Sequence, residues 1–326
     1  MTTFKTIGLS EDLLRALSEI GFETPSPIQE QAIPALLQDH TDFIGLAQTG
    51  TGKTAAFGLP LLEAIDPSKN HTQALVLAPT RELGRQIAEQ FNIFSKYLKR
   101  INVLAVYGGA PIVGQIKALK KPQHVIIATP GRLIDLIKRK SIQLNQLEIL
   151  VLDEADEMLN MGFKEELDRI LKYTPEEKQT WLFSATMPPD IRRIVAQYMV
   201  NPIEIKTNTE NKVNVNIAHQ FVVVRQADKF DALTRFIDLD DEMRGVVFCR
   251  TKRDTQNLAE DLLKRGYKAD SLHGDLSQPQ RDRVMKRFKA KAVQVLIATD
   301  VAARGIDVSD LTHVFHFALP DDTSYY

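Results

Sequence analysis

The stretch that decides the fold is Ile149-Leu-Val-Leu-Asp-Glu-Ala-Asp156. A short apolar run that ends in adjacent carboxylates is typical of a buried parallel strand, which delivers acids to the carboxyl edge of a sheet. Earlier in the chain a second informative stretch reads Ala47-Gln-Thr-Gly-Thr-Gly-Lys-Thr54.

This second stretch is a candidate phosphate cradle. Gly50 and Gly52 allow backbone amides to turn toward phosphates, Lys53 supplies a positive charge, and the Thr54 hydroxyl is placed to bind Mg²⁺. Ala47 stands where the usual pattern has its first glycine. Glycine-rich turns also occur in ordinary loops, but the combination with an acidic strand predicts a nucleotide triphosphatase. The residues expected to contact ATP here are Thr49, Gly50, Thr51, Gly52, Lys53 and Thr54.

Composition limits the class of protein. A chain of 326 residues suits two domains that each bury a core. Its 41 basic residues nearly balance its 42 acidic residues, so any nucleic-acid site must be local. The apolar runs are too short to cross a bilayer, and the N-terminus does not resemble a signal peptide. The single cysteine, Cys249, excludes an intramolecular disulfide and is expected to be a core residue. We expect a soluble, cytoplasmic protein.

Short apolar runs alternate with helix-period segments, which predicts parallel sheets covered by helices. In the first half the predicted strands are residues 43–47, 74–78, 102–107, 124–128, 149–152 and 180–183, and helices are predicted over residues 82–97 and 189–198. In the second half the predicted strands are residues 219–224, 245–248, 268–272, 293–298 and 312–317, and helices are predicted over residues 252–265 and 278–289.

The polar residues 208–216 predict a linker between two α/β domains, residues 1–207 and residues 217–326. The second half contains no second phosphate cradle. A sheet of this kind without its own cradle is best explained as a partner that closes over the nucleotide of the first domain.

With Asp-Glu-Ala-Asp at residues 153–156, the chain resembles the DEAD-box ATP-dependent RNA helicases of the bacterial type. The resemblance runs from Phe4 almost to the last residue, with the motifs in family order. It implies two RecA-like domains, ATP and Mg²⁺ as cofactors, and RNA as a partner that is bound through its backbone without sequence preference.

The resemblance assigns further residues to ATP. Residues 21–29 resemble the adenine-reading segment of the family, in which the Gln29 amide would pair with adenine and select ATP over GTP. Phe4 would stack on the base, although a core phenylalanine is the alternative interpretation. Residues 303–307 resemble the segment that reaches the ribose and the phosphates. The residues that these two regions add to the ATP contacts are Phe22, Thr24, Gly305 and Asp307.

Catalysis is expected from Lys53, Asp153 and Glu154. Asp153 would hold Mg²⁺ together with Thr54, partly through water, and Glu154 would orient the attacking water. The alternative for this pair of acids is a helix N-terminus, where acids are enriched. Their position directly after an apolar strand, in a chain with a phosphate cradle, favours chemistry.

Ser184-Ala-Thr186 resembles the coupling motif of the family. We predict that the hydroxyls of Ser184 and Thr186 bond to Asp156 and link the nucleotide state to domain closure. Gln278 and Arg281 match a further helix-borne coupling motif.

The expected RNA-binding residues follow predicted strands. Small residues and hydroxyls there can approach a sugar-phosphate backbone closely, and arginines add charge, which grips phosphates without reading bases. Ordinary turn chemistry is the alternative for each motif taken alone. In the first domain the residues are Thr80, Arg81, Gly108, Gly109, Thr129, Gly131 and Arg132. In the second domain they are Arg250, Thr251, Gly274 and Thr299.

The family continues beyond a segment like residues 319–326 into a His-Arg-Gly-Arg motif, whose arginines reach the γ-phosphate. The sequence stops before this motif, so we expect either a truncated version of a longer protein, which we favour, or severely weakened hydrolysis.

The function expected from the resemblance is an ATP-dependent RNA helicase that binds ATP and RNA across two domains and unwinds short duplexes or remodels RNA–protein complexes. One alternative is an ATP-controlled RNA clamp without productive turnover. A DNA helicase or an unrelated P-loop ATPase is a third interpretation, which the Asp-Glu-Ala-Asp sequence disfavours.

Overall fold

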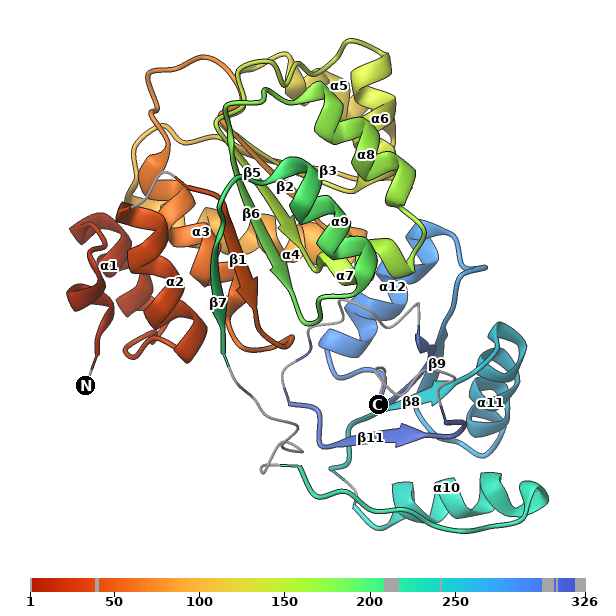
Figure 1. Cartoon of the computed structure of the whole chain (residues 1–326). Helices are drawn as coiled ribbons and strands as arrows, with labels where there is room; N and C mark the ends of the chain where they lie inside the picture. The colour runs from red at the N-terminus through yellow and green to blue at the C-terminus, as the bar shows by residue number, and fades with distance from the viewer. Residues whose placement is uncertain are drawn as a thin grey trace. The chain divides into compact units, whose positions relative to one another are not determined.

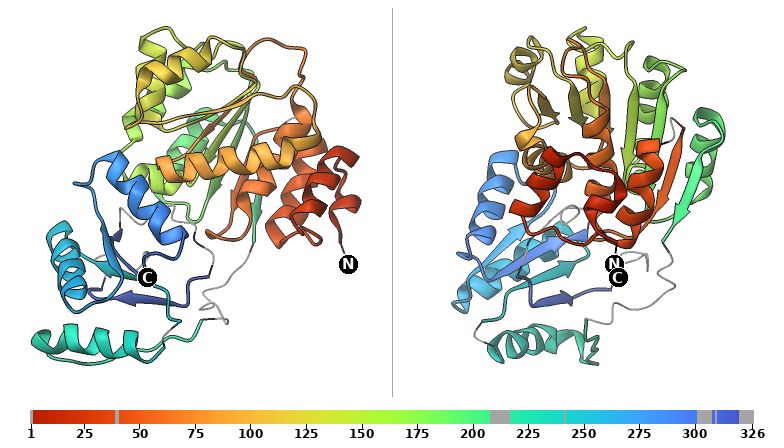
Figure 2. Two further views of the ribbon diagram at one scale, coloured as in Figure 1. Left: turned by 180° about the vertical axis from the view of Figure 1, so that it is seen from behind. Right: turned by 90° about the vertical axis from the view of Figure 1, so that its left-hand side faces the viewer.

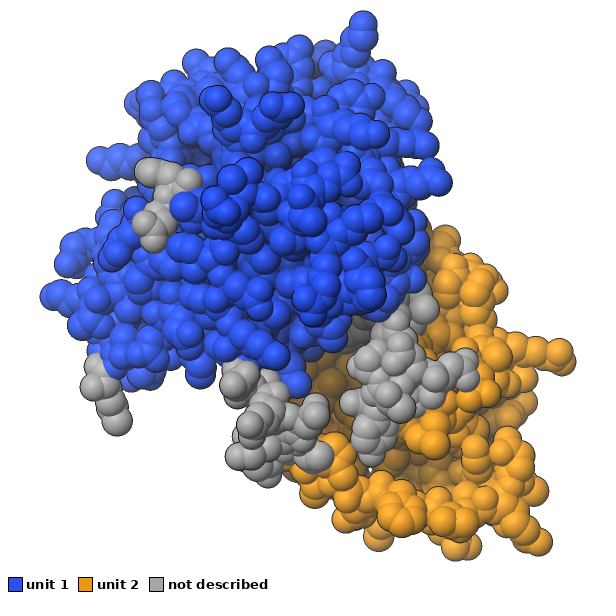
Figure 3. All heavy atoms as spheres, in the orientation of Figure 1, with its two compact units in different colours: residues 1–212 blue, residues 213–326 orange. Residues whose placement is uncertain are grey.

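Figure 1 presents the computed structural model, which describes residues 2–38, 41–207, 217–240, 242–300, 308 and 310–319. The chain separates into two compact units, residues 1–212 and residues 213–326 (Figure 3). The predicted linker, residues 208–216, lies outside the described residues.

The first unit is built on a seven-stranded sheet with the strand order β3-β4-β2-β5-β6-β1-β7. Every neighbouring pair of strands is parallel. The strands are β1 (Phe43–Leu46), β2 (Ala74–Leu77), β3 (Val103–Val106), β4 (Val125–Ala128), β5 (Ile149–Asp153), β6 (Gln179–Ser184) and β7 (Ile203–Lys206). The six strands predicted for this half of the chain are therefore confirmed, each to within one residue at either end.

Helices cover both faces of this sheet (Figure 2). The α-helices are α1 (Glu11–Glu19), α2 (Pro27–Gln38), α3 (Lys53–Ala64), α4 (Arg81–Phe94), α5 (Ile112–Leu119), α6 (Pro130–Lys138), α7 (Ala155–Asn160), α8 (Lys164–Tyr173) and α9 (Pro189–Tyr198). Two short 3₁₀ helices, η1 (Phe4–Ile7) and η2 (Ser95–Tyr97), complete the described helices of this unit.

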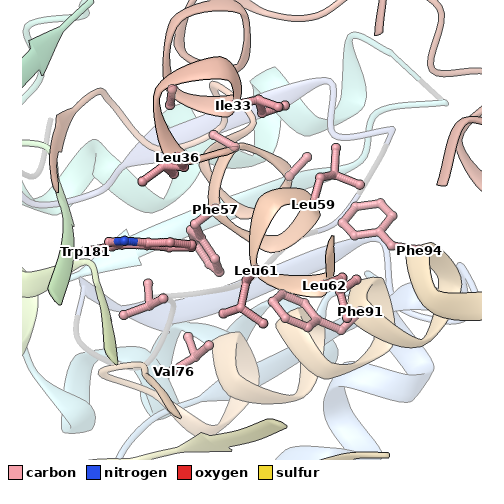
Figure 4. Packing of buried hydrophobic residues seen from close by; sticks show 14 of the residues in the cluster. Ile33, Leu36, Phe57, Leu59, Leu61, Leu62, Val76, Phe91, Phe94 and Trp181 are labelled. Atoms are coloured by element: carbon pink, nitrogen blue, oxygen red, sulfur yellow. The ribbon is translucent and has the colours of Figure 1, made fainter. Parts of the chain in front are cut away.

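Successive residues of each inner strand enter two different cores, because side chains alternate between the faces of a sheet. Val76 and Trp181 pack with helices α1 to α4, and Figure 4 shows them on the side of Phe57 and Leu61. Leu150 and the other alternate residues pack instead with α6 to α9. Burial on both faces explains why these strands read as continuous apolar runs rather than as an alternating pattern.

The second unit contains a four-stranded parallel sheet with the order β11-β8-β10-β9. Its strands are β8 (Gly245–Cys249), β9 (Ala269–Leu272), β10 (Val295–Thr299) and β11 (His313–His316). Its helices are η3 (Gln226–Asp228), α10 (Lys229–Asp238), α11 (Lys252–Lys264) and α12 (Gln278–Lys289). One core lies between the sheet and α10 with α11, and the other lies between the sheet and α12. The α/β class with two parallel sheets flanked by helices is thus confirmed.

Cys249 is buried at the end of β8. Burial, reinforced by the negative charges of Asp254 and Asp300, raises the pKa of its thiol to about 12. The interpretation of this cysteine as a core residue is confirmed.

One predicted strand is wrong. Residues 219–224 adopt no regular secondary structure, and the side chains of Phe221 and Val223 are 90% and 88% exposed. Their run of aromatic and β-branched residues is typical of a strand, but a strand also needs hydrogen-bonding partners, and the described strands of this sheet pair only with one another. Several elements are not predicted from the sequence, among them the edge strand β7 and the helix α10.

Candidate functional site

The glycine-rich segment forms the turn between β1 and α3. Gly50 and Gly52 have φ angles of 77° and 88°, in the left-handed region that other residues avoid. A Cβ atom at Gly52 would also lie 2.3 Å from Nε2 of Gln29, so the turn has no room for a side chain there. The turn therefore delivers the first amides of α3 to the carboxyl edge of the sheet, where a helix N-terminus favours an anion.

Lys53 is the first residue of α3, and its side chain is 6% exposed. Its Nζ atom is buried and has no hydrogen-bond partner within the described parts of the chain. A buried ammonium group is costly unless an anion or hydrogen bonds compensate it. A phosphate held at the N-terminus of α3 would supply both, so this residue fits a bound nucleotide.

Two carboxylates stand at the end of β5, at the same edge of the sheet. Asp153 is the last residue of the strand and is buried, and its Oδ1 accepts a hydrogen bond of 3.0 Å from the backbone N–H of Glu154. Glu154 has φ 49° and ψ 52°, a left-handed conformation that is uncommon for a residue with a side chain. Backbone strain of this kind is concentrated at functional sites, where surrounding structure maintains it.

Burial raises the pKa of Asp153 to about 6, and the nearby charge of Lys53 opposes this shift. Burial also raises the pKa of Glu154 to about 7, and the negative charge of Asp153 adds to the effect. The pair is therefore costly to ionise in the nucleotide-free chain, and a bound cation would relieve that cost.

The donor set fits Mg²⁺ better than a metal that needs an all-protein cage. Among the described residues, no group of three or more His, Cys, Asp or Glu side chains could hold a metal ion. Mg²⁺ usually keeps several waters and takes one or two carboxylates together with substrate phosphates. Asp153 and the hydroxyl of Thr54 are the residues that would hold it.

The raised pKa of Glu154 has a consequence for stability. A carboxyl group whose pKa is raised by folding binds its proton more tightly in the folded chain, so stability falls as the pH rises from about 4.5 to about 7. We expect Glu154→Gln to increase the free energy of unfolding of the nucleotide-free chain at pH 8 by about 1–3 kcal/mol, which raises the melting temperature by a few degrees. The gain should shrink toward pH 5. Thermal melts of both chains at the two pH values measure this.

Glu165→Gln is a matched control, because Glu165 is exposed on α8. It should show no gain that depends on pH. Equal stabilisation by Glu154→Gln at pH 5 and pH 8 would contradict the assignment of a raised pKa to this carboxyl group.

The segment after β6 is bonded to the beginning of α7. The Thr186 hydroxyl donates to Oδ2 of Asp156 at 2.7 Å, and the Thr186 backbone N–H donates to the same atom at 2.9 Å. The Asp156 backbone N–H donates to the Ser184 hydroxyl at 3.3 Å. The predicted contacts of both hydroxyls with Asp156 are therefore present, with Ser184 bonded to the backbone rather than to the carboxylate. The coupling role stays a prediction.

Gln29 is buried on α2, directly beside the glycine-rich turn. Its Oε1 accepts from the Ser26 backbone N–H at 2.9 Å, and its Nε2 donates to the Gly52 carbonyl at 3.0 Å. The Ser26 hydroxyl donates to the Thr51 carbonyl at 2.7 Å, which adds a second link to the turn. Sequence reasoning missed Ser26, although it lies inside the segment that resembles the adenine-reading motif.

Each polar atom of the Gln29 amide can form one more hydrogen bond, since an amide group offers two donors and two lone pairs. Adenine presents one acceptor and one donor along the edge that such an amide reads. We expect Gln29→Ala to reduce the preference for ATP over GTP by about tenfold, through the loss of this pairing. Competition binding of the two nucleotides measures the preference.

Gln123→Ala is the control, because the Gln123 amide donates to carbonyls near the end of α5. If Gln29→Ala leaves the nucleotide preference unchanged, Gln29 does not read the base.

Phe4 and Phe22 stack with their ring centroids 6.4 Å apart. Phe4 is 3% exposed and belongs to the core, whereas Phe22 is 40% exposed. The exposed ring of the pair is thus that of Phe22, and the adenine contact expected of Phe4 remains a prediction. Thr24 is exposed in the same segment. Gly305 and Asp307 lie outside the described residues.

The RNA-binding residues expected in the first unit follow β2, β3 and β4, which are neighbours in the sheet. Because parallel strands end at a common edge, the three segments gather there. Thr80 caps α4 by accepting from the Leu83 backbone N–H at 3.2 Å. The Arg81 guanidinium lies against the turn after β3, since a Cβ atom at Gly109 would be 1.8 Å from its Nη1.

The third segment opens α6, with Thr129 before its first residue and Gly131 in open space on its first turn. Arg132 turns toward the protein. Its Nη1 donates to Oε1 of Gln115 at 2.8 Å, and its Nη2 donates to the Ala110 carbonyl at 3.1 Å. Burial lowers the pKa of Arg132.

The second unit repeats this arrangement on its own sheet. Its candidate residues follow or end the neighbouring strands β8, β10 and β9, and they are Arg250, Thr251, Thr299 and Gly274. Thr251 caps α11 by accepting from the Asp254 backbone N–H at 3.1 Å. Gln278 and Arg281 lie in the first turns of α12.

Two parallel sheets flanked by helices, with a phosphate cradle and acids at the edge of the first sheet, define a P-loop nucleotide-binding protein of the RecA-like class. The DEAD/DEAH box helicase family matches residues 26–194, and the helicase conserved C-terminal domain matches residues 228–326. The chain therefore belongs to the DEAD/DEAH box helicase family.

Curated relatives agree with this assignment. The chain is 50% identical over all of its length to the DEAD-box ATP-dependent RNA helicase CshA of Bacillus cereus, and it spans 62% of the length of that relative. It is 49% identical to the CshA helicase of Geobacillus kaustophilus, again over its whole length, and spans 69% of that protein.

Solved structures agree as well. The chain is similar to S. cerevisiae Dbp5 L327V bound to RNA and ADP BeF3, with a TM-score of 0.89, 35% identity, and coverage of 99% of this chain and 82% of that one. It is also similar to a DEAD box protein from Methanococcus jannaschii, with a TM-score of 0.62, 42% identity, and coverage of 100% and 88%. No helix within the described residues is long and apolar enough to cross a membrane.

Proposed function

We propose that this chain is an ATP-dependent RNA helicase, which binds ATP and RNA across its two domains and separates short duplexes or remodels RNA–protein complexes. The observation that carries the proposal is the buried ammonium of Lys53, which has no hydrogen-bond partner among the described residues and lies near the carboxylates of Asp153 and Glu154. Three segments suited to a sugar-phosphate backbone occupy the same edge of the sheet. The similarity to a Dbp5 structure with bound RNA supports RNA as the partner.

In the proposed mechanism, Lys53 and the first amides of α3 hold the phosphates of ATP, and Gln29 selects adenine. Bound Mg²⁺, held by Thr54 and Asp153, would neutralise charge on the phosphate oxygens. The Glu154 carboxylate would accept a hydrogen bond from the attacking water, orient it and take its proton. Thr186, through Asp156, would couple the state of the nucleotide to the grip on RNA.

Phosphate contacts fix position without reading sequence, so the proposed RNA site accepts many sequences. We propose domain boundaries at residues 1–207 and 217–326 with a linker between them, which is consistent with the two matched regions. A cytoplasmic location, expected from the sequence, is part of the same proposal.

Steady-state ATP hydrolysis tests the proposal. The 326-residue chain is measured alone, with single-stranded RNA, and with single-stranded DNA of the same sequence. Stimulation by RNA but not by DNA is the expected result. Equal stimulation by DNA would contradict RNA as the substrate class, and RNA binding that requires ATP without any turnover would indicate an RNA clamp instead.

Removing the Thr186 hydroxyl should uncouple duplex separation from ATP hydrolysis. In Thr186→Val we expect RNA-stimulated ATP turnover to stay within about threefold and duplex separation to fall about tenfold, since one hydrogen bond to a buried carboxylate is lost. A fluorescent duplex-separation assay, run beside the ATPase assay, measures both. Thr174→Val is the control, because the Thr174 hydroxyl is also buried and bonded, to the Leu171 carbonyl. Equal loss of both activities would argue against coupling.

A further inference from the structure

Helix α5 has a glutamine at the centre of its apolar face. The spacing of Ile112, Gln115, Ile116 and Leu119 places these residues on one side of the helix. The three apolar members are partly buried against the core. Gln115 is 9% exposed and is the only buried residue of this helix. An amide in this position is costly unless its polar atoms are bonded, so its partners explain its presence.

Both polar atoms of Gln115 are used. Nε2 donates to the Tyr107 carbonyl at 3.0 Å, and Oε1 accepts from Nη1 of Arg132 at 2.8 Å. The other terminal nitrogen of Arg132 donates to the Ala110 carbonyl at 3.1 Å. The hydrogen bonds therefore reach the backbone immediately before and immediately after the turn at Gly108 and Gly109.

This turn needs such support. Two adjacent glycines have more conformational freedom than any other pair, and Gly109 has a φ of 80°. The Arg81 guanidinium packs against Gly109. The amide of Gln115 and the guanidinium of Arg132 hold the flanking carbonyls. The polar network joins segments that follow β3 and β4, and packing with Arg81 adds the segment that follows β2.

We propose that Gln115 is a positioning residue, which holds the turn at Gly108 and Gly109 and the side chain of Arg132 in the arrangement that grips the RNA backbone. The inference rests on the proposed function, because it concerns the same RNA-binding edge. Gln115 does not contact RNA in this proposal. It acts by keeping the three segments in register with successive phosphates.

Gln115→Met is the main test, because methionine has a similar length, suits an apolar face and removes both hydrogen bonds. RNA affinity is measured by the anisotropy of a short fluorescein-labelled single-stranded RNA, with a non-hydrolysable ATP analogue present and over a range of salt concentrations. We expect affinity to fall about five- to tenfold. The slope of log affinity against log salt should decrease by about 0.7 if one phosphate contact is lost.

ATP affinity without RNA should change less than twofold, and RNA-stimulated turnover should show a raised KM for RNA with a nearly unchanged kcat. Gln115→Glu keeps the acceptor for Arg132 but cannot donate to the Tyr107 carbonyl, so it should not restore RNA affinity. This variant also tests the proposal if Gln115→Met does not fold. Gln123→Met is the control for both variants, since Gln123 bonds to carbonyls at the far end of α5.

An RNA affinity equal to that of Gln123→Met would overturn the inference, and so would normal affinity in Gln115→Glu. A parallel loss of ATP affinity, RNA affinity and melting temperature would also overturn it, because it would mean a general structural role. Failure of the unchanged chain to bind RNA would reject the proposed function itself. RNA binding by the unchanged chain, without an effect at Gln115, would reject the positioning role alone.

Discussion

Glu154→Gln is expected to lower ATP turnover by about 10²- to 10⁴-fold and to leave ATP affinity within about twofold of the unchanged chain. Glutamine keeps the size of the side chain but cannot take a proton from the attacking water. Asp153, which precedes it, would still hold the cation, and Lys53 would still hold the phosphates. Single-turnover hydrolysis and equilibrium binding of a fluorescent ATP analogue separate the two effects.

The left-handed backbone at position 154 accepts glutamine as readily as glutamate, so the variant should fold. Glu165→Gln should hydrolyse ATP at the normal rate. Turnover of Glu154→Gln within about tenfold of normal would exclude Glu154 as the residue that activates water, and a strong loss of ATP affinity would mean that it acts in binding.

Lys53→Ala is expected to weaken ATP binding by about 10²-fold or more and to abolish turnover at ordinary ATP concentrations. The reason is the environment of the ammonium group, which is buried at the start of α3 and has no partner among the described residues. Charge-assisted hydrogen bonds to phosphate are stronger in such a place than at an exposed site. Calorimetric titration with ATP measures the loss.

Removal of this charge should change the stability of the nucleotide-free chain little, because the cost of burying the ammonium group offsets its attraction to the carboxylates of Asp153 and Glu154. Thermal melting of the nucleotide-free variant checks this point. Lys178→Ala is a suitable control, since Lys178 is partly buried but donates to the Pro175 carbonyl. ATP affinity that stays near normal in Lys53→Ala would place the phosphates elsewhere.

Much of the fold could be predicted because its strands are buried on both faces. The run that ends at Asp153 is continuous and apolar, and such runs are recognisable without any neighbour. Strand β7 is different, since Ile203-Glu-Ile-Lys206 is short and alternates at the edge of the sheet. Residues 219–224 end in a continuous apolar run but form no strand. Local pattern does not reveal which segments find a hydrogen-bonding neighbour.

In the site, too, some features could be predicted from local sequence and others depend on neighbouring segments. The phosphate cradle and the acidic strand end could be predicted because their residues are consecutive in the sequence. The left-handed backbone of Glu154 and the burial of the Lys53 ammonium, which has no hydrogen-bond partner in the described part of the chain, depend on packing around them. The partners of Gln115 are the Tyr107 carbonyl and the Arg132 side chain, which come from other segments and which no local pattern identifies. The only signal in the sequence is a glutamine within an apolar helical stripe.

The buried thiol of Cys249 has a practical consequence for spectroscopy. Alkylating dyes react with thiolates, and a thiol whose pKa is raised to about 12 is almost entirely protonated near neutral pH. The natural chain should therefore behave toward maleimides as if it had no cysteine. One cysteine introduced on the surface of each unit could then carry a donor and an acceptor dye, and energy transfer would follow the distance between the units as ATP and RNA are added.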